Sequence, residues 1–443
     1  MDEHQPLHIL FLPFLVPGHL IPTADMAALF AARGVRCTIL TTPVNAAVVR
    51  PAVDRANEDA LRGDAGGALP IDIAVVPFPD VGLPPGVESG TALASEEDRG
   101  KFVHAIQRLR EPFDRFMEEH HPDAVVADGF FTWSVDAAAE HGVPRLVFLG
   151  TSVFARSCQE SMVRHNPVEA CPDDDPDAAV SMPGLPHRVE MRRSQMIDPK
   201  KRPDHWAYFK MMNDADQRSY GEVFNSFHEL ETDYAEHYRT ALGRRAFSPA
   251  EMRELARGLD LSGMNFVWVI NGADDTDASG QWMPEGFAEL ISPRGDRGLT
   301  IRGWAPQMLI LNHPAVGGFV THCGWNSTLE AVSAGVPMVT WPRYADQFFN
   351  EKLIVEVLEV GVSVGSKDFA SNLENHQVIG GEVIAGAIRR VMGDGEEGAE
   401  AIREKAAELG VKARGALEKG GSSHDDVGRL MDALMARRTS VDV

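Results

Sequence analysis

A histidine and an aspartate each follow an apolar segment of the chain that reads as a buried strand. His19 lies in the turn after HILFLPFL, and Asp128 closes the segment DAVVAD. Because the carboxyl ends of parallel strands share one edge of a sheet, we expect the two side chains to meet there. A neutral imidazole can take a proton from a hydroxyl, and a neighbouring carboxylate fixes its tautomer and stabilises the imidazolium. The pair therefore indicates a general base. Alternatively, His19 is a helix N-cap or a surface donor, and Asp128 caps the helix that follows.

A second group of polar residues surrounds a predicted turn between a strand and a helix. The segment GGFVTHCGWNSTLEAVSAG places Cys323 to Ser327 at a helix N-terminus and His322 at the end of a strand. Free backbone N–H groups and the helix dipole favour an anion there, without glycine repeats or a metal. The alternative is that Ser327 and Glu330 form only a capping box, S-x-x-E.

Short apolar segments that alternate with helical patterns must position these side chains. They are HILFLPFL, VRCTILTT, IDIAVVPF, DAVVADGF and PRLVFLGT, and then, after a polar region at 156–220, NFVWVI, LTIRGW, GGFVTH, PMVTW and GVSVG. Such alternation predicts an α/β fold with parallel sheets covered on both faces. We expect two doubly wound domains, residues 1–243 and 247–420. An amphipathic helix in 421–443 is expected to pack back on the first domain.

The composition excludes several classes of protein. The 443 residues include 42 basic and 65 acidic side chains, a net charge of −23, which a nucleic acid backbone would repel. The four cysteines are isolated in the sequence, so neither a disulfide framework nor a zinc site is expected. The acidic clusters at 173–175 and 274–277 read as solvated loops rather than metal ligands. No apolar run is long enough to span a membrane, and the apolar opening follows acidic rather than basic residues, so we expect a cytoplasmic protein.

The 44 residues from Trp304 to Gln347 closely resemble the plant secondary product glycosyltransferase box of plant UDP-dependent glycosyltransferases. The resemblance implies the two-domain GT-B fold, with UDP-glucose as donor substrate and neither a metal nor another cofactor. It implies that Trp304 stacks on uracil and that Gln307 and Glu330 hold the ribose. It also implies that the diphosphate is contacted by His322, Asn326 and Ser327. The residues implied to face the sugar are Trp325, Asp346 and Gln347, and Ala305 is also implied to lie in the donor site.

The first domain is similar to the same family. The segment PFLVPGHLIPTADMA resembles the family's acceptor-domain turn, in which the histidine is the catalytic base, and Asp128 matches the family's dyad aspartate. The resemblance implies a single displacement with inversion, in which His19 deprotonates an acceptor that attacks C1 of the sugar. The acceptor would be a small flavonoid, terpenoid or hormone-like metabolite, and the enzyme a monomer.

The chain departs from the family at one junction. Ala246 runs directly into Phe247, where family members carry a linker and the first strand of the second sheet. We therefore expect that sheet to lack a central strand, within a deletion of a few tens of residues. Two other functions stay open: a truncated, inactive or weakly UDP-sugar-binding variant, and a nicotinamide-dependent oxidoreductase. The complete box and the missing G-x-G-x-x-G argue against the oxidoreductase.

Overall fold

The chain forms two compact units that interleave along the sequence. The computed structural model describes residues 6–62, 67–171, 175–237, 249–270, 297–302, 305–343, 346–367, 378–393 and 398–441. Unit 1 contains Met1–Gly150, Pro203–Asn225 and Ser422–Val443, and unit 2 contains Thr151–Arg202 and Ser226–Gly421. The terminal helix belongs with the first unit, as the sequence predicts. The segment 151–202 belongs with the second unit, whereas the sequence predicts domains divided near residue 245.

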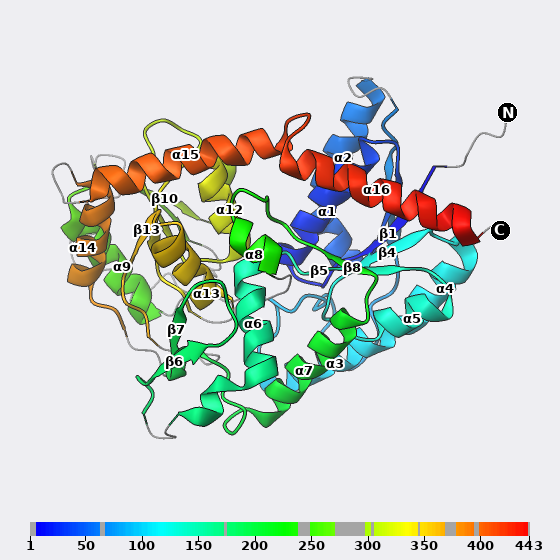
Figure 1. Ribbon diagram of the computed structural model, residues 1–443, viewed down its shortest axis with the longest axis horizontal. Coiled ribbons are helices and arrows are strands. Elements are labelled where there is room, and N and C mark those ends of the chain that lie inside the picture. Colours follow the sequence, from blue (N-terminus) through cyan, green and yellow to red (C-terminus); the bar gives the residue numbers. More distant parts are fainter. Residues whose placement is uncertain are drawn as a thin grey trace. The chain divides into compact units, whose positions relative to one another are not determined.

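Unit 1 is built on a six-stranded parallel sheet in the order β3-β2-β1-β4-β5-β8. Its strands are β1 (His8–Leu12), β2 (Arg36–Thr41), β3 (Ile71–Val75), β4 (Ala124–Ala127), β5 (Arg145–Phe148) and β8 (Gly221–Val223). The helices are α1 (Pro17–Ala31), α2 (Pro43–Arg62), α3 (Glu96–Arg108), α4 (Arg110–His120), α5 (Ser134–Glu140), α7 (Pro203–Gln217) and α16 (Ser422–Val441) (Figure 1). The five strands that the sequence predicts for this part are confirmed, and β1 lies at the centre.

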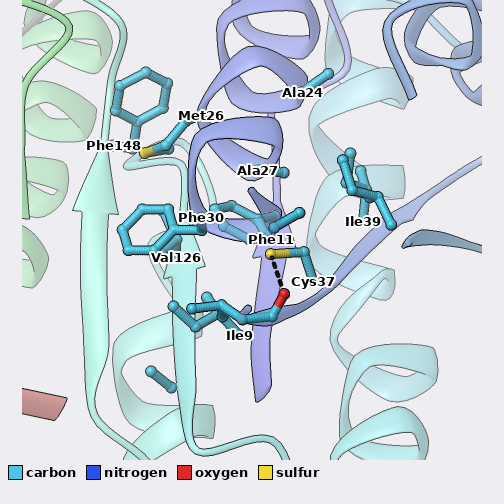
Figure 2. Packing of buried hydrophobic residues seen from close by; sticks show 14 of the residues in the cluster. Ile9, Phe11, Ala24, Met26, Ala27, Phe30, Cys37, Ile39, Val126 and Phe148 are labelled. Atoms are coloured by element: carbon cyan, nitrogen blue, oxygen red, sulfur yellow. Dashed lines mark hydrogen bonds between the residues drawn. The ribbon is translucent and has the colours of Figure 1, made fainter. Parts of the chain in front are cut away.

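Both faces of this sheet are apolar, because helices cover both. Ile9 and Phe11 of β1 point into one core cluster, and Leu10 and Leu12 point into the other. Figure 2 shows the first cluster, in which the rings of Phe11 and Phe30 lie 6.2 Å apart. The parallel pairing of β1 with β4 places their carboxyl ends next to each other, with Leu12 opposite Ala127.

The C-terminal helix α16 belongs to unit 1, and in Figure 1 it is the red helix that runs across the blue helices α1 and α2. Leu434 is buried in the first core cluster, and Arg33 donates to the carbonyl oxygen of His424 at 3.0 Å. At the far end of the helix, Arg438 contacts the Asp123 carboxylate at 3.3 Å. The last helix of the chain thus completes the core of the first unit.

Unit 2 contains two small parallel sheets, β10-β9 and β11-β12-β13, and an antiparallel β6-β7 pair. The strands are β6 (Ala179–Met182), β7 (Val189–Arg192), β9 (Phe266–Ile270), β10 (Gly298–Arg302), β11 (Phe319–Thr321), β12 (Met338–Thr340) and β13 (Gly361–Ser363). The α-helices are α6 (Val153–His165), α8 (Thr232–His237), α9 (Pro249–Ser262), α11 (Gln307–Leu311), α12 (Trp325–Ala334), α13 (Gln347–Lys352), α14 (Gly381–Met392) and α15 (Ala399–Leu417). Shorter turns of helix are η1 (Pro167–Ala170), η2 (Arg193–Gln195) and η4 (Leu353–Val357).

Among the described residues, the two parallel sheets share a core but no hydrogen-bonded ladder. Trp268 of β9 and Val339 of β12 belong to one buried cluster, together with side chains of α9 and α14. Within the described ranges, β9 pairs with β10 and β11 pairs with β12, each along one edge. A central strand that is missing would belong between β9 and β11. The junction of Ala246 and Phe247 lies outside the described residues, so the missing strand stays a prediction.

A buried carboxylate holds the start of α6. Glu231 accepts hydrogen bonds from the backbone N–H groups of Val153, at 3.2 Å, and Phe154, at 2.7 Å, and from Ser226 Oγ at 2.6 Å. Burial raises the pKa of Glu231 to about 7, against the opposing effect of these hydrogen bonds.

None of the described helices has the length and apolarity that crossing a membrane requires.

Candidate active site

The predicted His19–Asp128 pair meets at the carboxyl edge of the unit 1 sheet. His19 is the third residue of α1, directly beyond β1, and Asp128 directly follows β4. His19 Nδ1 lies 2.5 Å from Asp128 Oδ2, and the two residues are 5% and 3% exposed. The capping alternatives are wrong, because the N-caps of α1 and α5 are Val16 and Trp133. His19 is also too buried to be a surface donor.

The Asp128 carboxylate is fixed at both oxygens. While Oδ2 faces His19, Oδ1 accepts from the backbone N–H of Phe130 at 3.0 Å. Behind it, the buried Arg145 donates to the Asp128 carbonyl oxygen at 3.2 Å and pairs with Asp216 at 3.0 Å. Since a carboxylate only accepts, the contact assigns the proton to His19 Nδ1 and the lone pair to Nε2. That is the tautomer that a general base requires.

Aromatic side chains surround the imidazole. The rings of Phe14 and Phe130 lie 5.7 and 5.9 Å from the His19 ring, and they stack on each other at 4.3 Å. The ring of Tyr208 lies 6.3 Å from that of Phe130, and its hydroxyl donates to the Phe130 carbonyl oxygen at 3.1 Å. Burial raises the pKa of Tyr208, so its hydroxyl stays protonated. The sequence reasoning missed these three rings, although two of them lie within five residues of His19 or Asp128.

The turn predicted to bind an anion lies between β11 and α12. The N-cap of α12 is Gly324. A glycine is needed at this position because the Cβ of any other residue would lie 2.5 Å from His322 Nε2. Cys323, before it, has a left-handed backbone with φ of 63°. The helix begins at Trp325, so Asn326 and Ser327 occupy its first turn, where N–H groups and the helix dipole favour an anion.

The capping-box alternative for Ser327 and Glu330 is wrong. Ser327 is the third residue of α12, and the N-cap makes no side-chain hydrogen bond. Instead, Gln307 Nε2 donates to Ser327 Oγ at 3.2 Å and to Glu330 Oε2 at 2.5 Å. Gln307 and Glu330, the two residues expected to hold the ribose, therefore contact each other. A carboxylate and an amide side by side can form hydrogen bonds with two adjacent hydroxyl groups of a ribose.

Two of the three residues expected to face the sugar, Asp346 and Gln347, are buried at the start of α13. Gln347 is 0% exposed, and its Oε1 accepts from the backbone N–H of Arg343 at 2.9 Å. Asp346 is 3% exposed, and its Oδ2 accepts from Thr151 Oγ1 at 3.1 Å and from Asn350 Nδ2 at 2.8 Å. Ala305 and Trp325 are also buried, whereas Trp304 lies outside the described residues. These side chains belong to unit 2, and the His19–Asp128 pair belongs to unit 1.

Known proteins resemble the whole chain. The family profile described as "UDP-glucoronosyl and UDP-glucosyl transferase" matches residues 245–382, which include all of 304–347. A scopoletin glucosyltransferase of Nicotiana tabacum is 39% identical, over 97% of this chain and 98% of that protein. The chain belongs to the plant family 1 UDP-dependent glycosyltransferases. This membership excludes the oxidoreductase alternative.

Other relatives of this glycosyltransferase agree in sequence and fold. An anthocyanin 3'-O-beta-glucosyltransferase of Gentiana triflora is 37% identical, over 98% of this chain and 99% of that protein. A crystal structure of a Glycyrrhiza uralensis protein with glycyrrhetinic acid 3-O-monoglucuronide matches with a TM-score of 0.88 and 35% identity, covering 99% of this chain and 97% of that one. The fold is therefore the α/β GT-B fold.

This glycosyltransferase lacks residues that its relatives have. The alignment with the tobacco protein runs over 485 positions, 42 more than the 443 residues of the chain. At least 42 aligned positions therefore hold no residue of this chain. The deletion predicted between Ala246 and Phe247 is of this size, and its location stays a prediction.

Proposed function

We propose that this glycosyltransferase moves glucose from UDP-glucose to a hydroxyl of a small plant metabolite, with inversion at the sugar C1. The observation that carries the proposal is the buried contact of 2.5 Å between His19 Nδ1 and Asp128 Oδ2, which leaves a lone pair on Nε2. Nε2 takes the proton of the acceptor hydroxyl as its oxygen bonds to C1. The bond from C1 to the diphosphate oxygen breaks on the opposite side, and UDP leaves with the electron pair.

The remaining charges of the reaction have counterparts among the predicted donor residues. Negative charge grows on the leaving diphosphate, and the first turn of α12 with His322 supplies N–H groups and a favourable dipole. Positive charge grows on the imidazole, and the Asp128 carboxylate stabilises it. The buried carboxylate of Asp346 and amide of Gln347 supply paired hydrogen bonds for sugar hydroxyls.

The acceptor class that fits best is a planar phenol. The rings of Phe14 and Phe130 lie beside His19, the ring of Tyr208 lies beside Phe130, and flat aromatic faces favour stacking with an aromatic acceptor. The tobacco and gentian relatives are named for scopoletin and anthocyanin. We further propose that the enzyme is monomeric, cytoplasmic and independent of metals, so that transfer continues in EDTA.

The experiment that tests the proposal is glucose transfer to a panel of phenols, flavonoids and terpenoids, with the anomer of the product determined by NMR. Transfer with inversion yields the β-glucoside from UDP-α-glucose. His19→Ala should lower kcat by about 10²–10⁴-fold and leave UDP affinity nearly unchanged, because the nucleotide contacts are expected after residue 300. A variant that keeps more than about a tenth of wild-type turnover would overturn the role of His19. A wild-type protein that binds UDP but glucosylates no acceptor would favour the truncated, inactive alternative.

A further inference from the structure

Asn350 lies at the centre of a buried hydrogen-bond network in unit 2. It belongs to α13, and it is 0% exposed. Its Nδ2 donates to Asp346 Oδ2 at 2.8 Å and to the backbone carbonyl oxygen of Cys323 at 2.9 Å. The two hydrogens of one amide group therefore end on two separate parts of the predicted donor site. One part is the turn before α12, and the other is the carboxylate expected to face the sugar.

The Cys323 end of this network fixes an unusual backbone conformation. Residues other than glycine rarely adopt the left-handed conformation of Cys323, and such residues need support from their surroundings. Thr321 Oγ1 accepts from the Cys323 N–H at 3.1 Å, and Asn350 donates to the Cys323 carbonyl oxygen. Side chains thus hold the peptide groups on both sides of this residue. Because α12 starts two residues later, Asn350 helps to set the direction of its N-terminus.

The orientation of the Asn350 amide is determined by a third contact. Ser152, the N-cap of α6, accepts from the Ala155 N–H at 2.9 Å and contacts Asn350 Oδ1 at 2.8 Å. The Asp346 carboxylate and the Cys323 carbonyl oxygen can only accept, so the Nδ2 end of the Asn350 amide faces them. The Oδ1 end then faces Ser152, and the single hydroxyl hydrogen of Ser152 is donated to it.

We propose that Asn350 is a positioning residue of the donor site. It couples the turn that receives the diphosphate to the carboxylate that receives the sugar, and Ser152 orients its amide. This inference rests on the proposed function, because it takes a UDP-sugar as the ligand. It adds that the geometry between diphosphate and sugar is set by a residue that contacts neither.

The test compares Asn350→Asp with the wild-type protein and with Asn312→Asp. Asn350→Asp keeps the size of the side chain but places a carboxylate oxygen against Asp346 Oδ2 and the Cys323 carbonyl oxygen. The negative charges on these oxygens repel one another. Asn312 is the matched control, because its Nδ2 donates at the exposed end of α11, to the Met308 carbonyl oxygen at 2.8 Å. Calorimetry measures the Kd of UDP and of UDP-glucose, and kinetics measure the ratio of UDP-glucose to UDP-galactose use.

Asn350→Asp should raise the ratio of the UDP-glucose Kd to the UDP Kd by about tenfold or more, and should change the glucose-to-galactose ratio. Asn312→Asp should change neither ratio. A purely structural role would weaken both ligands equally, so an unchanged Kd ratio in a folded Asn350→Asp protein overturns the proposal.

Ser152→Ala keeps both donors of Asn350 and serves if Asn350→Asp fails to fold. It should move the same Kd ratio in the same direction, by about threefold. An unchanged ratio in Ser152→Ala, with a normal melting temperature, also overturns the proposal. These binding ratios need no acceptor, so they separate a failure of this inference from a failure of glucose transfer, which the acceptor panel reports.

Discussion

Replacing Asp128 with asparagine removes the charge of the His19–Asp128 pair and keeps its shape. Asp128 accepts two hydrogen bonds, from His19 at Oδ2 and from the Phe130 N–H at Oδ1. An asparagine has one oxygen, so its NH₂ group must face one of these two donors. If it faces Phe130, a hydrogen bond is lost and the imidazolium loses its anionic partner. If it faces His19, Nδ1 must accept, the proton moves to Nε2, and the base disappears.

Both orientations slow transfer by a similar amount. Two opposite unit charges about 4 Å apart interact by roughly 4 kcal/mol at an effective dielectric constant near 20, which corresponds to a factor near 10³ in rate. The wrong tautomer is expected to cost about as much or more. We therefore expect Asp128→Asn to lower kcat by about 10²–10⁴-fold at saturating UDP-glucose, with the UDP Kd unchanged.

The control is a second Asp–His pair of unit 1. Asp114 Oδ1 lies 3.3 Å from His141 Nε2, and the side chains of both are partly exposed. Asp114→Asn should keep wild-type kcat. In addition, the double variant of His19→Ala and Asp128→Asn should be no slower than His19→Ala alone, because the two residues act as one unit. An Asp128→Asn protein within about fivefold of wild-type kcat would refute the orienting role, and so would additive losses in the double variant.

Two further predictions concern stability. In the folded protein the pKa of Glu231 is about 7, above the ordinary value of 4.5. The folded state therefore binds this proton more tightly than the unfolded state does. The contribution of Glu231 to the free energy of unfolding is highest below pH 4.5, and it falls by about 3 kcal/mol as the pH rises to 7. The Glu231→Gln variant should lack this fall. Urea unfolding of the wild-type protein and of Glu231→Gln, each at pH 5 and pH 8, measures the change in unfolding free energy. An equal change in the wild type and the variant would contradict the raised pKa. Inserting the tobacco relative's linker and strand between Ala246 and Phe247 should raise soluble yield, melting temperature and glucose transfer, because a strand between β9 and β11 would pair on both edges. Equal values with and without the insert would show that unit 2 needs no such strand.

The sequence predicts the parallel strands because each is a short apolar run. All ten predicted strands are confirmed. The β6-β7 pair and β8 are missed, since β8 has the sequence GEV, which is not an apolar run, and β6 alternates exposed and buried positions within a polar region. No local pattern separates these segments from loops.

The His19–Asp128 contact is predictable because the ends of neighbouring parallel strands share an edge. The interleaving of the units is not predictable in this way. The placement of Thr151 in unit 2 depends on contacts such as its hydrogen bond to Asp346, 195 residues away. The capping-box alternative for Ser327 fails for a local reason: serine is a common N-cap, but the left-handed Cys323 allows the helix to begin at Trp325.

The return of α16 to unit 1 has a consequence for how the protein is made. Val427, Leu430 and Met431 pack against the core cluster of β1 and α1, and Leu434 is buried in it. In the sequence α16 follows all of the second unit, so the first unit completes its core only after the whole second unit has been translated. During synthesis the apolar surface that α16 will cover stays exposed, and chaperones can bind it. A truncation that removes Leu434 therefore acts on the core that contains β1.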